Sequence, residues 1–186
     1  MKTLILNGSP REEGNTAFIV KEIARRLDGE YRIVDAYRCN ISPCVDCRHC
    51  KTNNDCAIND EMKEIYEYIE ECDNILIASP IYFSELTGKL LDIGSRLQKY
   101  FCARYFRHEN PLPKPKRGAA VLVGGSGKDM NKAWDTAKIL LHQMNCTQIH
   151  KALCCRSTDT VAAADNAEAA VEIKNLIQFF NREDKE

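Results

Sequence analysis

The stretch of sequence that decides the fold is Thr3-Leu4-Ile5-Leu6-Asn7-Gly8-Ser9-Pro10-Arg11-Glu12-Glu13-Gly14-Asn15-Thr16. Its first residues form an apolar run that is typical of a buried β-strand. A polar turn with two glycines follows directly, and after the turn the apolar residues recur with a helical period. A strand that leads through a glycine turn into a helix is the opening unit of a parallel α/β sheet.

The rest of the chain repeats this alternation. Apolar strand-like runs lie at residues 3–7, 31–35, 74–78, 119–124 and 147–153, and segments of helical period lie at 15–27, 60–71, 86–101, 131–144 and 165–181. The run at 74–78 is apolar on both faces, as in a parallel sheet covered by helices on both sides. We therefore predict a doubly wound α/β fold with five parallel strands in the flavodoxin-like order 2-1-3-4-5. A single domain should span residues 1–186, with a cysteine-rich insertion at 38–58 after the second strand.

Composition and charge exclude several classes of partner. The formal net charge of -1 favours neither nucleic acid nor an anionic membrane. No apolar run has the length of a membrane span, and the first residues lack the features of a signal peptide. We expect a cytoplasmic chain whose ten cysteines are reduced rather than paired in a disulfide framework.

The first turn has the features of a phosphate site. Gly8 and Gly14 permit tight backbone, and Ser9, Asn15 and Thr16 place short polar side chains at the start of the helix. Unpaired backbone N–H groups there point outward at the positive end of the helix dipole. The turn lacks the lysine of an ATP-binding loop and the third glycine of a dinucleotide fingerprint. A plain helix cap is the alternative, but the residues favour a single monophosphate.

Two further loops should lie at the same edge of the sheet. The third strand ends in Pro80, Tyr82 and Phe83, which offer flat surface to a planar ring, and the fourth ends in Gly124 and Gly125. Each loop alone is equally compatible with core packing or a tight turn. Together they indicate a pocket for a heterocycle beside the phosphate turn.

The insertion carries four cysteines with the spacing C-x2-C-x2-C-x5-C, at Cys44, Cys47, Cys50 and Cys56. Three thiolates at successive x2 spacing can converge on one iron–sulfur cluster. Zinc is a second reading, although structural zinc more often takes two separated pairs of ligands. A third reading is a structural loop of reduced or partly disulfide-bonded cysteines.

These motifs together resemble the NADPH-dependent FMN reductase family of flavodoxin-like proteins. The resemblance implies bound FMN, with residues of the first turn on its phosphate and the other two loops around its isoalloxazine ring. The phosphate residues would be Ser9, Arg11, Asn15 and Thr16, and the ring residues Pro80, Ile81, Tyr82, Phe83, Gly124 and Gly125. The cysteine spacing is similar to that of iron–sulfur flavoproteins, which implies a [4Fe-4S] cluster on Cys44, Cys47, Cys50 and Cys56. The family is usually homodimeric.

The expected activity is FMN-dependent oxidation of NAD(P)H, with electrons passed to a small acceptor such as a quinone or a flavin, either directly or through the [4Fe-4S] cluster. Tyr82 is the side chain expected to touch the reacting region. The alternative is a non-enzymatic electron carrier that accepts electrons from a ferredoxin-like partner. A weaker alternative is a zinc-stabilised domain with no redox role. The polar loop at 104–117 could contact a nicotinamide phosphate or an acidic partner, but a solvated loop is the simpler expectation.

Overall fold

The sheet has the predicted order of strands. The computed structural model describes residues 1–182, and its strands run β2-β1-β3-β4-β5, with every neighbouring pair parallel. The sheet-forming segments are β1 (Lys2–Asn7), β2 (Glu30–Asp35), β3 (Asn74–Pro80), β4 (Lys116–Val123), β5 (Cys146–Ile149) and β6 (Leu153–Cys155). The prediction of a doubly wound, flavodoxin-like α/β fold is confirmed.

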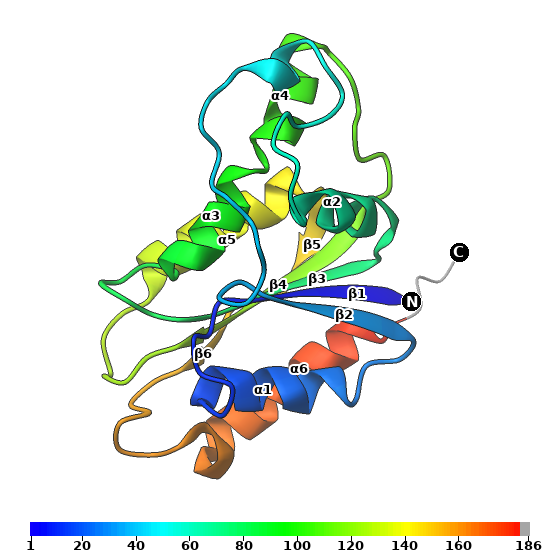
Figure 1. The fold of residues 1–186 in the computed structure, drawn as a ribbon. Helices are drawn as coiled ribbons and strands as arrows, with labels where there is room; N and C mark the ends of the chain where they lie inside the picture. The colour runs from blue at the N-terminus through cyan, green and yellow to red at the C-terminus, as the bar shows by residue number, and fades with distance from the viewer. Residues whose placement is uncertain (183–186) are drawn as a thin grey trace.

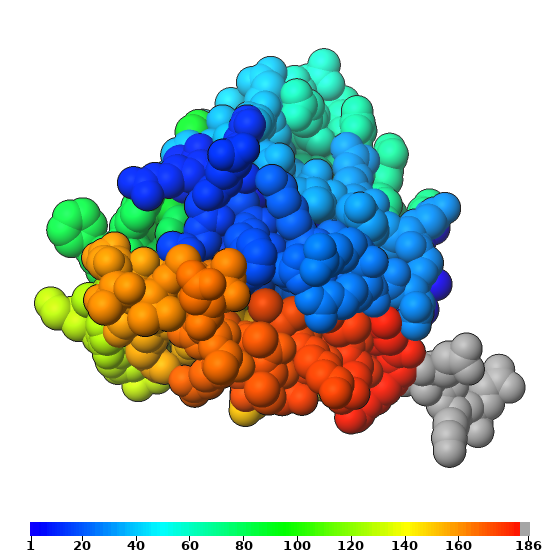
Figure 2. All heavy atoms as spheres, turned by 90° about the horizontal axis from the view of Figure 1, so that it is seen from below, coloured from blue at the N-terminus to red at the C-terminus, as the bar shows by residue number. Residues whose placement is uncertain are grey.

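Helices cover both faces of the sheet (Figure 1). One face carries α1 (Asn15–Ala24) and α6 (Ala167–Phe180), which lie side by side when the molecule is seen from below (Figure 2). The other face carries α2 (Met62–Glu71), α3 (Gly88–Ser95) and α5 (Asn131–Gln143). The helix α4 (Gln98–Phe106) rises away from the sheet as an arm, together with the short helix η1 (His49–Lys51) of the cysteine-rich insertion. A second short helix, η2 (Ala163–Asp165), precedes α6.

The central strand β3 shows why the sheet is buried on both sides. Ile75 and Ile77 pack into the core under α2, α3 and α5, whereas Leu76 and Ala78 pack into the core under α1 and α6. All four side chains are fully buried. Each large one contributes about 1.5–3 kcal/mol relative to an exposed position. A strand that is apolar at every position is therefore the expected sequence for this place in the sheet.

One helix expected from the sequence is divided into two in the structure. The sequence predicts a single helix over 86–101, but the structure has α3 and α4 separated by a turn at Arg96 and Leu97. The side chain of Arg96 contacts the insertion at Ser42 and Cys56 and pairs with Asp60, just after the insertion. Since α4 continues to Phe106 and β4 begins at Lys116, the polar loop expected at 104–117 shortens to 107–115.

The fifth strand is also divided. The sequence predicts one strand over 147–153, but β5 and β6 pair with successive parts of β4 and are separated by residues 150–152. The pairing shifts register at Lys116 and Arg117, and the backbone N–H of His150 donates to the carbonyl of Gly118. The polar residues His150 and Lys151 occupy the break. The outcome is a loop after Cys155 that leaves the sheet at the same edge as the first turn.

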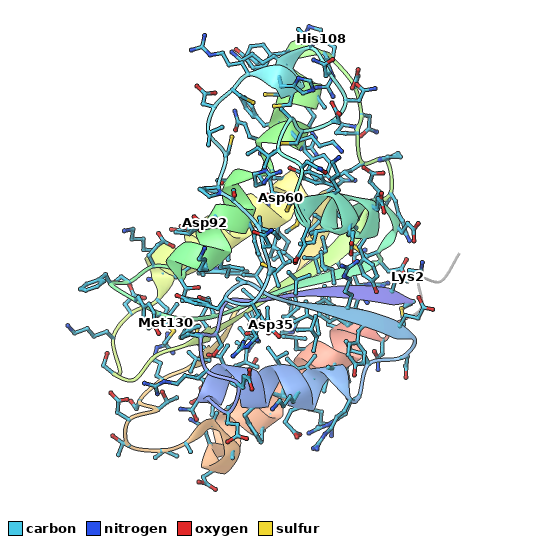
Figure 3. The ribbon with its side chains drawn as sticks, in the orientation of Figure 1. Lys2, Asp35, Asp60, Asp92, His108 and Met130 are labelled. Atoms are coloured by element: carbon cyan, nitrogen blue, oxygen red, sulfur yellow. The ribbon has the colours of Figure 1, made fainter. Side chains whose placement is uncertain are left out.

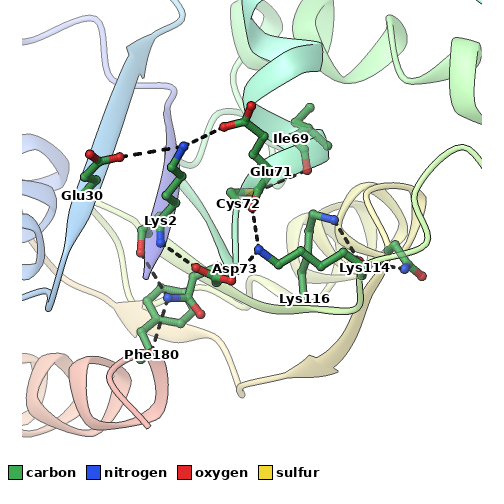
Figure 4. A network of polar contacts seen from close by, with 12 residues as sticks. Lys2, Glu30, Ile69, Glu71, Cys72, Asp73, Lys114, Lys116 and Phe180 are labelled. Carbon is green, nitrogen blue, oxygen red and sulfur yellow. Dashed lines mark hydrogen bonds and ion pairs between the residues drawn. The ribbon is translucent and has the colours of Figure 1, made fainter. Parts of the chain in front are cut away.

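The opposite edge of the sheet is closed by a network of polar contacts (Figure 4). The Lys2 backbone N–H donates to Asp73 at 2.6 Å, and Lys114 Nζ pairs with the other Asp73 oxygen, also at 2.6 Å. Lys2 Nζ lies 2.6 Å from a carboxylate oxygen of Glu71. The buried Lys116 donates to the Lys114 carbonyl at 2.9 Å. Among residues 1–182, no helix is both long and apolar enough to cross a membrane.

Candidate functional site

The first turn is tied to the loop after β3. The Gly8 N–H donates to the Ala78 carbonyl at 2.7 Å, and the Thr87 hydroxyl donates to the Gly8 carbonyl at 2.9 Å. A Cβ atom on Gly8 would lie 2.7 Å from that hydroxyl oxygen. Gly8 is required here because the two loops approach each other so closely.

Side chains of the turn hold one another in place. Asn7 donates to Asp35 at 2.6 Å and accepts from the Ser9 N–H at 3.1 Å. The Ser9 hydroxyl in turn accepts from the Arg11 N–H at 3.2 Å. Asp35, which ends the second strand, therefore supports the turn through Asn7.

The start of α1 is free to receive an anion. Its N-cap residue is Gly14, no side chain caps the helix, and its first turn contains no acidic residue. The first N–H groups of a helix have no partner within the helix, and together with the dipole they favour a negatively charged ligand. The plain helix cap considered from the sequence is therefore absent at this helix start. The Asn15 side-chain oxygen accepts from the Ala163 N–H at 2.8 Å, which fixes the Asn15 amide beside η2.

The turn opens into a hollow of about 460 Å³ at the carboxyl edge of the sheet. Most of the residues predicted to bind the cofactor line this one hollow. They are Ser9, Arg11, Asn15, Thr16, Pro80, Ile81, Tyr82 and Gly125. Gly124 and Phe83 line an adjoining hollow of about 250 Å³, which shares Ile81 and Gly125 with the first. Met130, also in the lining of the second hollow, is labelled at this edge in Figure 3.

The loop after β3 places Tyr82 at the rim. The Tyr82 and Glu85 backbones exchange two hydrogen bonds of 3.0 Å, which closes the loop into a tight turn. Phe83 and Ser84 at the tip have φ angles of 53° and 64°. Tyr82 is 47% exposed and lines the larger hollow, whereas the side chain of Phe83 is fully exposed. The structure thus separates the side chains of Phe83 and Tyr82, although the sequence analysis assigned both to the isoalloxazine ring.

The loop after β6 contributes residues that the sequence analysis missed. The Thr158 N–H donates to the Gly124 carbonyl at 3.1 Å, and the Asp159 N–H donates to the Gly125 carbonyl at 3.2 Å. A Cβ atom on Gly125 would lie 2.4 Å from an Asp159 carboxylate oxygen. Thr158, Asp159 and Glu13 also line the larger hollow. Because Thr158 and Asp159 follow the last strand, the rule that ligands bind at carboxyl ends could have indicated them.

The four cysteines of the C-x2-C-x2-C-x5-C motif line a second, separate hollow. Cys44, Cys47, Cys50 and Cys56 all line it, with Cys102 of α4 as a fifth. The hollow is small, about 20 Å³. Within residues 1–182, no three cysteine, histidine or acidic side chains are arranged as around a metal ion, and the cysteines described are free thiols.

Other side chains give this hollow a particular chemistry. Burial, and after it the neighbouring Cys102 thiol, raises the pKa of the Cys50 thiol well above its ordinary value. His49 also lines the hollow, and its Nε2 atom contacts Asp55 at 2.8 Å. Arg96 and Lys99 also line the hollow. Four thiols from one loop beside fixed positive charge match a thiolate-held centre in donor type. In the described residues their sulfur atoms are not arranged around one metal position.

Comparison with known proteins supports the same fold and identifies the family. The sequence profile of the NADPH-dependent FMN reductase family matches residues 1–158. An iron–sulfur flavoprotein of Methanocaldococcus jannaschii is 32% identical over 129 residues, which cover 68% of this chain and 63% of that protein. The chain thus spans less than two thirds of the length of this relative.

Solved structures show how widely the architecture is shared. The NAD(P)H:quinone oxidoreductase of Methanothermobacter marburgensis superposes with a TM-score of 0.75 at 12% identity, over 100% of this chain and 99% of that one. An FMN-dependent NADH-azoreductase of Bacillus anthracis, solved in complex with FMN, superposes with a TM-score of 0.69 at 11% identity, over 97% and 99% of the two chains. At these identities the likeness establishes the fold, and the family profile establishes the lineage. The chain belongs to the NADPH-dependent FMN reductase family.

Proposed function

We propose that this protein is an FMN-dependent oxidoreductase that takes electrons from NAD(P)H and passes them to a small acceptor such as a quinone or a flavin. The observation that carries the proposal is the 460 Å³ hollow at the carboxyl edge of the sheet, which adjoins the uncapped start of α1. The hollow combines a place for a single phosphate with flat side chains beside it. The proposal also agrees with the family and with the names of the structural neighbours.

Each wall of the hollow has a part in binding. Ser9, Arg11, Asn15 and Thr16 would surround the phosphate. The uncapped N–H groups at the start of α1 and the Arg11 guanidinium would donate to it, because the Ser9 and Arg11 N–H groups already bond within the turn. Pro80, Ile81 and Tyr82 would flank the ring, Gly125 would let backbone approach its edge, and Gly124 and Phe83 would act from the adjoining hollow. Bound FMN would supply the electron-transfer chemistry, and the protein would bind and orient it. Tyr82 at the rim would contact the incoming nicotinamide or acceptor, since it is partly exposed.

The cysteine hollow supports a finer proposal, a [4Fe-4S] cluster held by Cys44, Cys47, Cys50 and Cys56. All four thiols line one hollow, and the names of the relatives, which are iron–sulfur flavoproteins, also favour a cluster. The cluster would relay single electrons to or from the flavin. This hollow also favours the second candidate, an electron carrier served by a ferredoxin-like partner and without turnover of a small substrate.

The α4 arm supports the proposal of a homodimer. Phe101 stacks on Tyr105 there, and Phe106 meets both rings edge to face, at ring-centroid distances of 5.0–6.4 Å. All three side chains remain exposed. A contiguous exposed aromatic cluster is typical of an interaction surface.

The free thiols agree with a reducing, cytoplasmic location.

The test is the full chain purified without oxygen. We expect flavin absorption bands, binding of added FMN at micromolar concentration, and oxidation of NADH or NADPH that a quinone stimulates. A broad iron–sulfur absorption on top of the flavin bands, with iron and sulfide in the protein, would support the cluster. FMN binding without nucleotide oxidation would favour the electron carrier. A colourless protein that does not bind FMN would contradict both candidates.

A further inference from the structure

Arg96 is a fully buried guanidinium in the wall of the cysteine hollow, and neither the phosphate turn nor the flavin loops use it. It lies in the turn between α3 and α4, and its side chain is 1% exposed. One amino group, Nη1, donates to Asp60 at 2.6 Å and to the Ser42 carbonyl at 2.9 Å. Asp60 lies at the base of the arm, whose tip is marked by His108 (Figure 3).

The second amino group of Arg96 reaches a sulfur. Nη2 lies 3.3 Å from the Sγ atom of Cys56 and 3.4 Å from the carbonyl oxygen of Ile58. Arg96 therefore contacts the insertion at Ser42, two residues before Cys44, and at the last cysteine, Cys56. Because the guanidinium is planar and rigid, these contacts fix where the two ends of the cysteine loop stand relative to each other.

Residues at the end of α3 and just after α4 hold other parts of the same loop. The Ser95 hydroxyl accepts from the Cys44 N–H at 2.9 Å, and the Arg107 guanidinium donates to the Cys50 carbonyl. Three of the four cysteines of the C-x2-C-x2-C-x5-C motif are thus anchored by Ser95, Arg96 or Arg107. Of these anchors, only the one from Arg96 reaches a sulfur atom.

One donor of this buried cation lacks a partner. The Arg96 Nε atom is inaccessible to solvent and has no hydrogen-bond acceptor among residues 1–182. A buried polar group is normally satisfied, and an arginine is always charged. A cation with an unused donor, in the wall of a hollow lined by thiols, is suited to an anionic sulfur ligand set.

We propose that Arg96 is the positioning residue of the cysteine hollow: it sets the place of Cys56 and supplies a permanent positive hydrogen-bond donor to the sulfur side of a thiolate-bound metal centre. The inference rests on the proposed use of the cysteines as metal ligands. It assigns a role in that site to a residue outside the cysteine motif. Hydrogen bonds to coordinating sulfur withdraw electron density from it, so the same contact should tune the bound metal.

The experiment uses Co²⁺ as the probe, because its absorption spectrum reports sulfur ligation. The full-length apo protein is titrated without oxygen in the presence of a competing chelator, for the wild type, Arg96→Gln and Arg96→Lys. The matched control is Arg104→Gln, which removes a part-buried arginine of the same arm that bonds to Gln143 and does not line the hollow. Circular dichroism checks that each variant is folded.

We expect Arg96→Gln to weaken Co²⁺ binding by about tenfold or more, the effect typical of losing a partner of a metal ligand. The sulfur-to-metal absorption band should also shift to lower energy, because the Cys56 sulfur loses its donor. Arg96→Lys should recover part of the affinity, since it retains the charge but cannot bond Asp60 and Cys56 together. Arg104→Gln should match the wild type.

Wild-type affinity and an unshifted band in Arg96→Gln would overturn the proposal. If Arg96→Gln does not fold, Arg96→Lys decides, and wild-type affinity and an unshifted band in that variant would overturn it equally. If the wild type binds Co²⁺ through its thiols but is purified without iron, the proposal of a [4Fe-4S] cluster is contradicted, while the inference about Arg96 is still supported by the Co²⁺ titration. A wild type that does not bind Co²⁺ through sulfur would overturn the inference, whereas FMN binding would still test the proposed oxidoreductase separately.

Discussion

Asp60 is a single carboxylate that organises the base of the arm. Besides its ion pair with Arg96, it accepts from the N–H groups of Ser42 at 3.0 Å and Met62 at 3.1 Å. Burial alone would raise the pKa of Asp60, but these hydrogen bonds and the charge of Arg96 outweigh it and hold the pKa below its ordinary value. The carboxylate is thus stabilised in its ionised form.

Replacing Asp60 should therefore cost stability in a pH-dependent way. We expect Asp60→Asn to lower the free energy of unfolding by about 3–5 kcal/mol at pH 7, because it leaves a buried Arg96 without its counter-charge. With a folded pKa below the unfolded value of about 3.9, the stabilisation is complete above that pH and is lost as the pH falls through the folded value. Urea unfolding of both proteins at pH 7 and pH 3 measures the difference, which should shrink at pH 3. A difference that stays constant would contradict the linkage.

Gly125 sets a second residue-scale prediction. A methyl group there would collide with Asp159, 2.4 Å away, whereas nothing lies within 4 Å of a methyl group on Gly88. We expect Gly125→Ala to displace the loop after β6 and to weaken FMN binding by about tenfold or more, as losses of one or two hydrogen bonds to a charged ligand do. Gly88→Ala should bind FMN like the wild type. Fluorescence titration with FMN gives both affinities, and equal affinities would exclude a role of this contact in binding.

At the scale of elements, the sequence predicted the existence of nearly every helix and strand but not where two of them break. The periodicity of a sequence depends only on which residues are apolar. It therefore predicts one helix across Arg96 and Leu97, where the structure has α3 and α4. The break depends on Arg96 meeting Asp60, which lies 36 positions away in the chain. The division of β5 from β6 likewise follows from the register against β4. Such pairings between distant segments leave no trace in local spacing.

The helix α5 provides a prediction at this scale, because one of its faces lies on the sheet and the other faces solvent. Leu141 is fully buried against the core, whereas Ile139 on the same helix is 61% exposed. We expect Leu141→Ala to cost about 2–5 kcal/mol of unfolding free energy through lost burial and the cavity left behind. Ile139→Ala should change it by less than about 0.5 kcal/mol. Denaturant unfolding compares the two, and similar losses would mean that α5 is packed differently.

The candidate site was predictable to a similar extent. Glycines and short polar residues at strand ends indicated Ser9, Asn15 and Thr16 from the sequence, because parallel strands end at one edge. Asp159 could not be paired with Gly125 in this way. Its position depends on β6 leaving the sheet at Cys155, two residues beyond the end expected from the apolar pattern. Phe83 was grouped with Tyr82 since adjacent residues share a loop, but the positive φ angles at its tip direct the two side chains apart.

At the scale of the whole molecule, one sheet joins two cores. Leu4, Leu6 and Ile77 belong to one core, and Ile5 and Leu76 belong to the other, so neighbouring residues of the same strand contribute to opposite sides. Neither core can be lost while the sheet persists. The single domain expected over residues 1–186 stays a prediction.

Unfolding should therefore occur in one cooperative step. The single tryptophan, Trp134, packs on the core beneath α5, whereas far-ultraviolet circular dichroism reports all helices. We expect the fluorescence and circular dichroism transitions in urea to coincide, as for a two-state domain. Transitions with different midpoints would show that the α1 and α6 side unfolds independently. The cofactor-free protein is the relevant sample, since bound FMN would add its own stabilisation.

The loop that leaves β6 connects the hollow to the end of the chain. The Asp159 N–H donates to the Gly125 carbonyl, and four residues later the Ala163 N–H donates to the Asn15 side chain, beside the phosphate turn. A ligand bound between these two points would stabilise the position of the residues that follow in the chain, including α6. Slow amide exchange in α6 would then depend on occupancy of a pocket that α6 itself does not line.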